Sequence, residues 1–247
     1  MTTISEEYKL PSGGKIYTKQ FDPIIRLRSM TVEDEMKRCN TALKPYKAMC
    51  DILDTCLESK IPYSTYDLCL ADYQYLIHKL RIVTYGSKYQ MISTCPVCGA
   101  KIDNEVDLTQ LNEKSITEDV LNLLEFDLPV SGDRIKIKMQ TPRDLDNISI
   151  ETDELQEKFP DMPNPISLVV LKSLIDTING KPLDKVFGLE KLKQMPARDM
   201  NKILKRAERI NNELGVNISI DVKCPKCGLK TKTGFRYTDE FFRPTED

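Results

Sequence analysis

The stretch Thr94-Cys-Pro-Val-Cys-Gly-Ala-Lys101 contains two cysteines separated by two residues, with a proline between them and a glycine after the second. In this pattern the backbone N–H groups turn toward the sulfurs, and proline presets the turn. The unit is typical of a zinc knuckle, but it supplies only two thiolates. A closed structural zinc site takes four ligands in a tetrahedron. The sequence must therefore provide two more ligands elsewhere.

A second pair, Cys224-Pro-Lys-Cys227-Gly228, stands near the end of the chain. Strand-like segments flank each pair, so each predicts a β-ribbon with a knuckle at its tip. Together they predict one structural Zn²⁺ per chain, bound by Cys95, Cys98, Cys224 and Cys227. Two alternatives remain. One is a redox dithiol, which needs a strand-to-helix turn that neither knuckle has. The other is a metal shared between the knuckles of two chains.

The two halves of the chain repeat one another, which explains why the ligand pairs lie so far apart. Residues 10–16 and 128–135 both begin Leu-Pro and contain a Ser-Gly step, and each leads into an alternating strand. Each strand is followed by a Thr-x-x-Asp helix start, with Pro142 at the favoured first position of the second helix. Candidate glycine caps then stand at equal distances before the two knuckles, at Gly86 and Gly215.

We therefore predict an α+β protein of two related, helix-rich halves, each ending in a knuckle-bearing ribbon and joined by the split zinc site. The expected boundaries are residues 1–111 for the first half, 112–125 for a polar connector and 126–247 for the second half. The apolar periodicity predicts helices in both halves. They cover the stripe from Met49 to Leu57 and the ranges 66–85, 166–178 and 197–214.

Composition places the chain among ordinary globular proteins, with 247 residues, 40% of them hydrophobic and 30% charged. Its 36 Lys and Arg against 38 Asp and Glu give a net charge of −2, so no global attraction to nucleic acid or anionic membranes exists. No signal-peptide run follows Met1, and no stretch reaches the roughly 18 apolar residues of a membrane helix. We expect folding in a cytosol. Four single cysteines are then expected as buried thiols: Cys39, Cys50, Cys56 and Cys69.

Catalytic signatures are missing from the sequence. It contains no P-loop, Rossmann fingerprint, Gly-x-Ser-x-Gly or His-Glu-x-x-His pattern. The only histidine, His78, falls in a nearly all-apolar helix and is expected to be structural. Ser12-Gly13-Gly14 lacks the Lys-Ser/Thr of a phosphate loop and predicts a turn between strands. We therefore expect no enzyme and no small-molecule substrate.

The second ribbon is basic, and it carries no acidic residue from Lys223 to Arg236. We expect a partner there, and an acidic protein is favoured over nucleic acid because the chain as a whole is acidic. The cations on the polar side of helix 197–214 are expected to form only a solvated face. They are Lys202, Lys205, Arg206 and Arg209. Phe241 and Phe242 either pack onto the core or dock into a neighbouring subunit. The candidate partner-binding residues are Lys226, Lys230, Lys232, Arg236, Phe241 and Phe242.

Four segments together resemble the baseplate proteins of T4-type contractile-tailed bacteriophages, and the similar members are hub proteins and hub-assembly factors. These segments are LPSGGKIY, IIRLRSMT, TVEDE and YGSKYQMISTCPVCG. The resemblance covers most of the chain and is most specific toward the N-terminus. It implies a non-enzymatic structural or assembly component of the virion tail baseplate, made in the host cytoplasm and bound to other baseplate hub proteins. The alternative is a zinc-ribbon protein that binds nucleic acid through the basic second ribbon.

Overall fold

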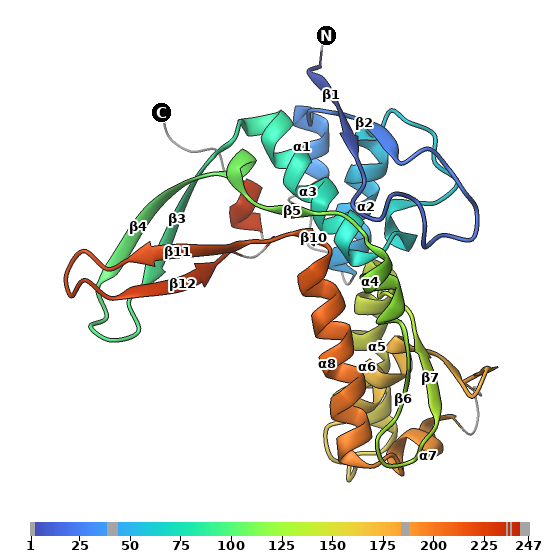
Figure 1. Cartoon of the computed structure of the whole chain (residues 1–247). Coiled ribbons are helices and arrows are strands. Elements are labelled where there is room, and N and C mark those ends of the chain that lie inside the picture. Colours follow the sequence, from blue (N-terminus) through green and yellow to red (C-terminus); the bar gives the residue numbers. More distant parts are fainter. Residues whose placement is uncertain (1–2, 39–43, 184–187, 236, 238, 243–247) are drawn as a thin grey trace.

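The computed structural model describes residues 3–38, 44–183, 188–235, 237 and 239–242. This described part is a mixed α+β structure with eight α-helices and small antiparallel sheets. It has two helical bodies and a projecting arm (Figure 1). The first body contains β1, β2 and α1 to α3, and the second contains β6 to β9 and α5 to α8. The arm consists of two β-ribbons, one from each half of the sequence.

The first body packs a hairpin against three helices. The hairpin pairs β1 (Ser5–Lys9) with β2 (Ile24–Arg28), and the helices are α1 (Val32–Arg38), α2 (Pro45–Cys56) and α3 (Leu70–Tyr85). A 3-10 turn, η1 (Thr65–Asp67), precedes α3. The helix predicted over residues 66–85 therefore begins later, because Leu68 and Cys69 are extended and end the 3-10 turn. As predicted, α3 is buried nearly all round and forms the centre of the body.

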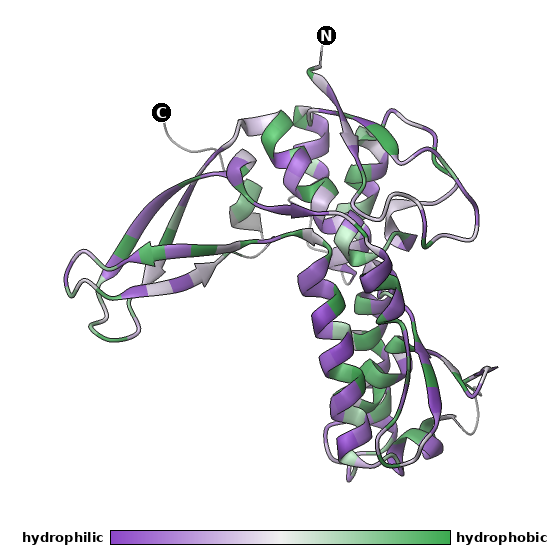
Figure 2. Cartoon of the chain, in the orientation of Figure 1, coloured by the Kyte–Doolittle hydropathy of each residue, from purple (hydrophilic) through white to green (hydrophobic). Residues whose placement is uncertain are grey.

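The second body places helices against a four-stranded sheet of order β6-β7-β8-β9. Its strands are β6 (Glu125–Asp127), β7 (Arg134–Ile137), β8 (Ile175–Ile178) and β9 (Lys181–Pro182). Its helices are α5 (Pro142–Lys158), α6 (Ile166–Leu174), α7 (Gly188–Lys193) and α8 (Ala197–Glu213). Figure 2 shows a largely hydrophilic α8 in front of the hydrophobic α6.

The helix predicted over residues 166–178 is wrong in its last turn. Residues 175–178 form β8, which pairs with β7. The segment Ile-Asp-Thr-Ile has the β-branched residues that suit a strand, and a turn follows it at Asn179 and Gly180, both with positive φ. A uniform apolar run does not reveal where a helix gives way to a buried strand.

The arm consists of two antiparallel ribbons with a cysteine knuckle at each tip. The first ribbon pairs β3 (Lys88–Thr94) with β4 (Lys101–Asp107), and the second pairs β11 (Ser219–Lys223) with β12 (Lys230–Gly234). Their inner faces contribute Met91, Ile102 and Val222 to a single buried cluster. Their outer faces are therefore left to solvent on opposite sides of the arm.

The buried side chains form two clusters that do not follow the predicted halves of the sequence. The first cluster combines the first body with both ribbons, and the second cluster combines the second body with α4 (Glu118–Asn122). The predicted connector also has structure, because β5 (Glu113–Lys114) pairs with β10 (Gly215–Val216) at the entry to the second ribbon. The second ribbon thus belongs to the second half in sequence and packs with the first body in space.

The same helix start occurs in both halves. At α1 the Thr31 N–H donates to the Asp34 carboxylate, and at α5 the Thr141 N–H donates to Asp144, both at 2.9 Å. In return each aspartate N–H donates to the threonine hydroxyl, so each helix begins with a reciprocal capping box. A basic residue six positions before each aspartate makes an ion pair with it. These pairs are Arg28–Asp34 at 2.8 Å and Lys138–Asp144 at 2.9 Å.

A buried aspartate in the first turn of a long helix holds the hairpin loop in each half. Asp72 of α3 accepts hydrogen bonds from the Ser12 N–H at 2.9 Å and from the Ser12 hydroxyl at 2.5 Å. Asp199 of α8 accepts from the N–H groups of Val130 and Ser131 at 2.9 and 3.0 Å. Each bound loop is the one that opens with Leu-Pro. The Ser12-Gly13-Gly14 segment is therefore a turn between strands, as predicted.

Helix α5 joins the two bodies. Its Asp146 accepts hydrogen bonds from the N–H groups of Tyr46 and Lys47 in the first turn of α2, at 3.4 and 2.9 Å. No side chain from the flanking residue Lys44 caps α2, so a residue far along the chain supplies the cap. Arg143 of α5 also makes an ion pair with Asp67 at 2.6 Å. The orientation of the second body on the first is fixed by these polar contacts.

Candidate metal centre

The four knuckle cysteines meet at the tip of the arm. The sulfur atoms of Cys95, Cys98, Cys224 and Cys227 all lie within 4.8 Å of one another. The Cys95–Cys227 and Cys98–Cys224 sulfurs are 3.6 Å apart. A tetrahedral site with Zn–S bonds of about 2.3 Å has sulfur–sulfur edges of about 3.8 Å, whereas a disulfide measures about 2.05 Å. The residues present therefore fit a four-thiolate metal site within one chain.

The backbone of each knuckle has the same hydrogen bonds. The N–H of the first cysteine donates to the carbonyl five residues ahead, from Cys95 to Ala100 and from Cys224 to Leu229, both at 2.9 Å. The glycine after each second cysteine donates back to the first cysteine, at 3.0 Å in both knuckles. These glycines, Gly99 and Gly228, have φ of +69° and +72°. Glycine adopts this left-handed conformation without steric cost, which explains its place in both motifs.

The knuckle backbone prepares the first cysteine of each pair for ligation. The N–H groups of Cys98 and Val97 point toward the Cys95 sulfur and lower its pKa to about 6. The N–H groups of Cys227 and Lys226 lower the pKa of Cys224 in the same way. Metals bind the thiolate, so these amides favour the ligand form.

The second cysteine of each pair has a raised pKa, because four sulfurs lie close together with no positive charge between them. The Ala100 N–H favours the thiolate of Cys98, yet the neighbouring sulfurs of Cys224 and Cys95 raise the pKa of Cys98. The pKa of Cys227 is raised as well. A divalent cation would neutralise this crowding.

The two knuckles are related by a local two-fold arrangement. Exchanging Cys95 with Cys224 and Cys98 with Cys227 converts one 3.6 Å sulfur pair into the other. Both knuckles connect strands, so neither has the strand-to-helix turn of a redox dithiol. Cys95 and Cys224 are buried, Cys98 is half-buried and Cys227 is exposed. Four protein ligands leave no open coordination position, which is the arrangement of a structural site.

Of the predicted lysines, Lys230 and Lys232 lie on the outer face of β12 and Lys226 lies in the knuckle turn. Lys226, Lys230 and Lys232 are exposed, and within the described part of the chain none of them takes part in an ion pair. Arg236 lies outside the described residues. The lysines are therefore free to contact a partner, and their role as contact residues stays a prediction.

The expectation that Phe241 and Phe242 dock into a neighbouring subunit is corrected by their burial. Their exposed fractions are 0% and 3%. The Phe241 ring stacks on Phe235 with ring centres 5.2 Å apart, and Phe242 lies under the Arg38 guanidinium. Both rings belong to the buried cluster that includes the inner faces of the two ribbons. The other alternative, packing onto the core, holds for both side chains.

Sequence reasoning missed Arg81, a fully buried arginine in α3. Its guanidinium donates to the carbonyls of Phe241, Gly86 and Lys88 at 2.9, 2.8 and 3.1 Å. Burial lowers the pKa of Arg81. The side chain ties α3, the start of the first ribbon and the segment after the second ribbon together. The available signal was a basic residue between the apolar Leu80 and Ile82 in a helix that was predicted to be buried nearly all round.

The remaining predicted structural residues occupy the core. His78 is fully buried, its Nε2 lies 3.0 Å from the Leu108 carbonyl, and burial lowers its pKa to about 4, so it is neutral near pH 7. Cys50, Cys56 and Cys69 are buried thiols, as predicted, while Cys39 lies outside the described residues. None of the helices described here combines the length and the apolarity that crossing a bilayer requires.

Comparison with known proteins gives one match that spans nearly the whole chain. The model of the family described as T4 bacteriophage base plate protein matches residues 1–243. No curated protein and no solved structure matches the chain. The matched range includes both knuckles and both bodies.

Proposed function

Since the chain belongs to the T4 bacteriophage base plate protein family, we propose that it acts as a zinc-stabilised adaptor in the hub region of a contractile-tail baseplate. Membership of the family makes the chain a phage baseplate component. The proposal adds the hub position, the zinc and the adaptor role, as a resident subunit or as an assembly factor. The observation that carries it is the family match combined with a four-thiolate cluster that closes only when a ribbon from each half of the sequence meets the other.

The zinc part of the proposal is supported by the chemistry of the donor set. Four cysteine sulfurs within 4.8 Å of one another suit Zn²⁺, which prefers a tetrahedral set of thiolates in structural sites. Bound zinc would supply folding free energy and hold the two ribbons together. Cys95 and Cys98 come from the first ribbon and Cys224 and Cys227 from the second, so one Zn²⁺ per chain is expected.

We further infer that the two halves arose by internal duplication. The proposed boundaries are residues 1–111 and 126–247, with 112–125 as connector. Support comes from polar contacts that recur at corresponding places, namely the capping boxes, the aspartates that hold the hairpin loops and the knuckle hydrogen bonds. An adaptor built this way has two similar frameworks whose surfaces differ. Such a part suits a place where unlike subunits meet.

A structural role is consistent with the polar groups of the described core. His78 is buried and neutral, Arg81 donates to three backbone carbonyls, and the buried aspartates Asp72 and Asp199 hold loops. Each of these groups already has a task in the fold. Baseplate structural proteins are typically non-enzymatic, which supports a non-enzymatic role for this chain.

Two measurements test the proposal. Peptide mass spectrometry of purified particles from the source phage should find the chain at a fixed, low copy number, and its presence only in infected-cell lysate would make it an assembly factor. Metal analysis of the purified chain should give one zinc per chain whatever its oligomeric state. Zinc held at one per chain by a monomer would place the site within one chain, whereas zinc held only by a dimer would mean a site shared between chains. A chain without zinc that keeps its full stability would exclude the metal.

A further inference from the structure

Helix α8 exposes cations on successive turns, with the exposed Glu208 among them. We call Lys202, Lys205 and Arg209 the basic row. Lys205 and Arg209 are exposed and Lys202 is half-exposed. Among the residues that the structure describes, no carboxylate forms an ion pair with any member of the row. The row therefore presents positive charge that no ion pair within the described residues neutralises.

In three other helices a lysine forms an ion pair with a carboxylate of the same helix. In α1 Lys37 pairs with Glu33, in α2 Lys47 pairs with Asp51, and in α7 Lys193 pairs with Glu190. In α8 Lys202 has Lys205 and Arg206 three and four positions away, and Glu208, three positions from Lys205, makes no ion pair with it. Like charges at these spacings destabilise a helix. The basic row thus works against the stability of the isolated chain, and an opposing charge from outside would relieve it.

The second ribbon shows the same pattern. Lys223 and Lys230 are direct partners across the strands β11 and β12 and lie on the outer face. Like charges at directly opposed positions destabilise a sheet. The first ribbon has Thr94 opposite Lys101 at the corresponding place, so its pair carries a single charge. We call Lys223 and Lys230 the lysine pair.

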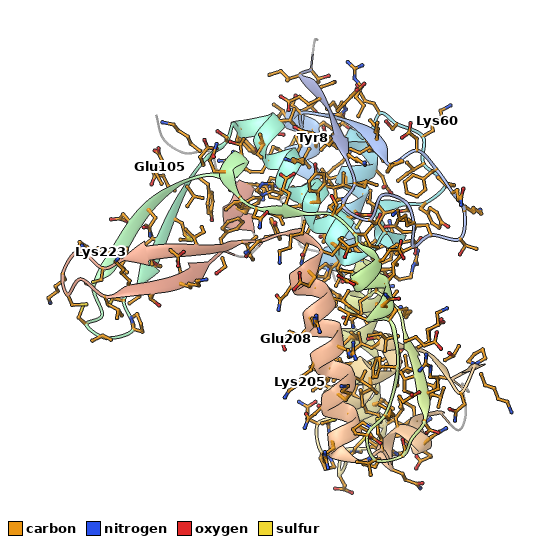
Figure 3. The ribbon with its side chains drawn as sticks, viewed as in Figure 1. Tyr8, Lys60, Glu105, Lys205, Glu208 and Lys223 are labelled. Carbon is orange, nitrogen blue, oxygen red and sulfur yellow. The ribbon has the colours of Figure 1, made fainter. Side chains whose placement is uncertain are left out.

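The basic row and the lysine pair belong to one strongly basic segment. Residues 197–234 contain nine Lys and Arg against four Asp and Glu, a net charge of +5, in a chain whose net charge is −2. In Figure 3 Lys205 lies on the side of α8 toward the arm, and Lys223 lies on the arm. Only β10 and a short turn separate α8 from the second ribbon.

We propose that the basic row and the lysine pair together form the docking surface for an acidic face of another baseplate protein. The proposal rests on the proposed function, that the chain is built into a baseplate. Complementary charge gives such an interface its specificity and its rate of association. A protein is favoured over nucleic acid because residues 197–234 contain no aromatic side chain on which a base could stack, and Phe235, Phe241 and Phe242 are buried.

The test reverses the basic row and leaves the rest of the fold in place. The variant is Lys202→Glu, Lys205→Glu, Arg209→Glu. Its matched control is Lys15→Glu, Lys19→Glu, Lys60→Glu, which reverses three exposed lysines on the first body and changes the net charge equally. Figure 3 places Lys60 on the far side of the first body from α8. Each variant is supplied from a plasmid to a phage that lacks the gene, and copies per particle are counted by mass spectrometry.

We expect the basic-row variant to be incorporated at least tenfold less than the wild-type chain, and the control to be incorporated normally. Thermal unfolding of both purified variants checks their folding. If the triple variant unfolds, Lys205→Glu alone replaces it, with a smaller loss expected. Normal incorporation of a folded basic-row variant overturns the proposal. Absence of the wild-type chain from both particles and baseplate assembly intermediates instead overturns the proposed function, on which this inference depends.

A second readout separates a protein partner from nucleic acid. Fluorescence anisotropy of a short, labelled duplex DNA is measured with the wild-type chain and with the basic-row variant. We expect no binding at physiological salt. Binding that the basic-row variant loses and the control retains would overturn the proposal in favour of a nucleic-acid surface, because phosphate contacts made by these cations would cause it.

Discussion

The two halves of this chain keep the same polar contacts to backbone and differ in how deeply they bury them. Asp34 and Asp144 both close capping boxes, but the Asp34 side chain is 2% exposed and the Asp144 side chain 16%. Helix α3 is surrounded by the first body and the ribbons, whereas α8 buries one side and exposes the other. The comparison teaches that two regions can be held by the same kinds of hydrogen bond to backbone while their surfaces differ.

Mutation of the four-cysteine cluster should have the largest effect on stability, because the cluster takes two ligands from each half of the chain. Cys224→Ser removes one of four thiolates and should lower zinc content and destabilise both bodies, by about 4 kcal/mol or about 10 °C in Tm. Cys69→Ala, a buried thiol far from the cluster, serves as control and should leave zinc content unchanged. Metal analysis and differential scanning calorimetry measure both quantities. A Cys224→Ser chain with wild-type zinc content and Tm would contradict the shared site.

The buried arginine gives the next largest difference between the halves. Arg81 stands five residues before Gly86, and Ile210 stands at the corresponding place before Gly215. Arg81→Met leaves three carbonyl groups without their donor and should cost about 3 kcal/mol in the free energy of unfolding. Ile210→Met exchanges one apolar side chain for another and should cost less than about 1.5 kcal/mol. Urea unfolding compares the two, and equal costs would mean that the three hydrogen bonds add no net stability.

Much of the framework could be predicted from the sequence because its signals are local. The Thr-x-x-Asp helix starts, the alternating strands before them and the Cys-x-x-Cys-Gly turns each occupy a few consecutive residues, and the structure contains all of them. The two knuckles could be assigned to one site because a structural zinc takes four ligands and each knuckle supplies only two. The amphipathic pattern of α8 also predicted its range to within one residue.

What the sequence did not reveal depends on contacts between distant residues. Asp146 caps a helix of the first body, and nothing near it in sequence marks that task. Phe241 and Phe242 follow a basic ribbon, and whether they face solvent or core depends on where that ribbon packs. The second ribbon packs with the first body, so the buried clusters divide the chain differently from the predicted halves. Tertiary placement of this kind overrides local pattern.

The ion pairs of the two capping boxes should differ in strength. Arg28→Met leaves Asp34 buried without its cation and should cost about 2 kcal/mol, because a buried charge then lacks its partner. Lys138→Met breaks a pair in which the lysine side chain is 44% exposed, and it should cost less than about 1 kcal/mol. Chemical denaturation of the two variants tests this. A cost for Lys138→Met as large as that for Arg28→Met would mean that burial does not distinguish the two halves.

The dependence of the unfolding free energy on pH in acid gives the test with the smallest expected effect. It is also the most selective test, because it reports on single carboxyl groups. Burial alone would raise the pKa of Asp34, but hydrogen bonds from Arg28 and Thr31 outweigh it and lower the pKa to about 2. A carboxyl whose folded pKa is depressed stabilises the fold above its unfolded pKa, and that contribution is lost as the pH falls from about 4 to about 2. Asp34→Asn should therefore remove about 1–2 kcal/mol of pH dependence in this window.

Asp72 provides the contrast, because burial raises its pKa. A raised carboxyl pKa favours the folded state at low pH, so its contribution to stability declines as the pH rises from about 4 through its folded pKa. Asp72→Asn should accordingly steepen the loss of stability in acid, where Asp34→Asn flattens it. Urea unfolding at steps from pH 2 to pH 7 measures both slopes. If both variants change the acid limb in the same direction, the hydrogen bonds around Asp34 do not outweigh its burial as they do in this structure.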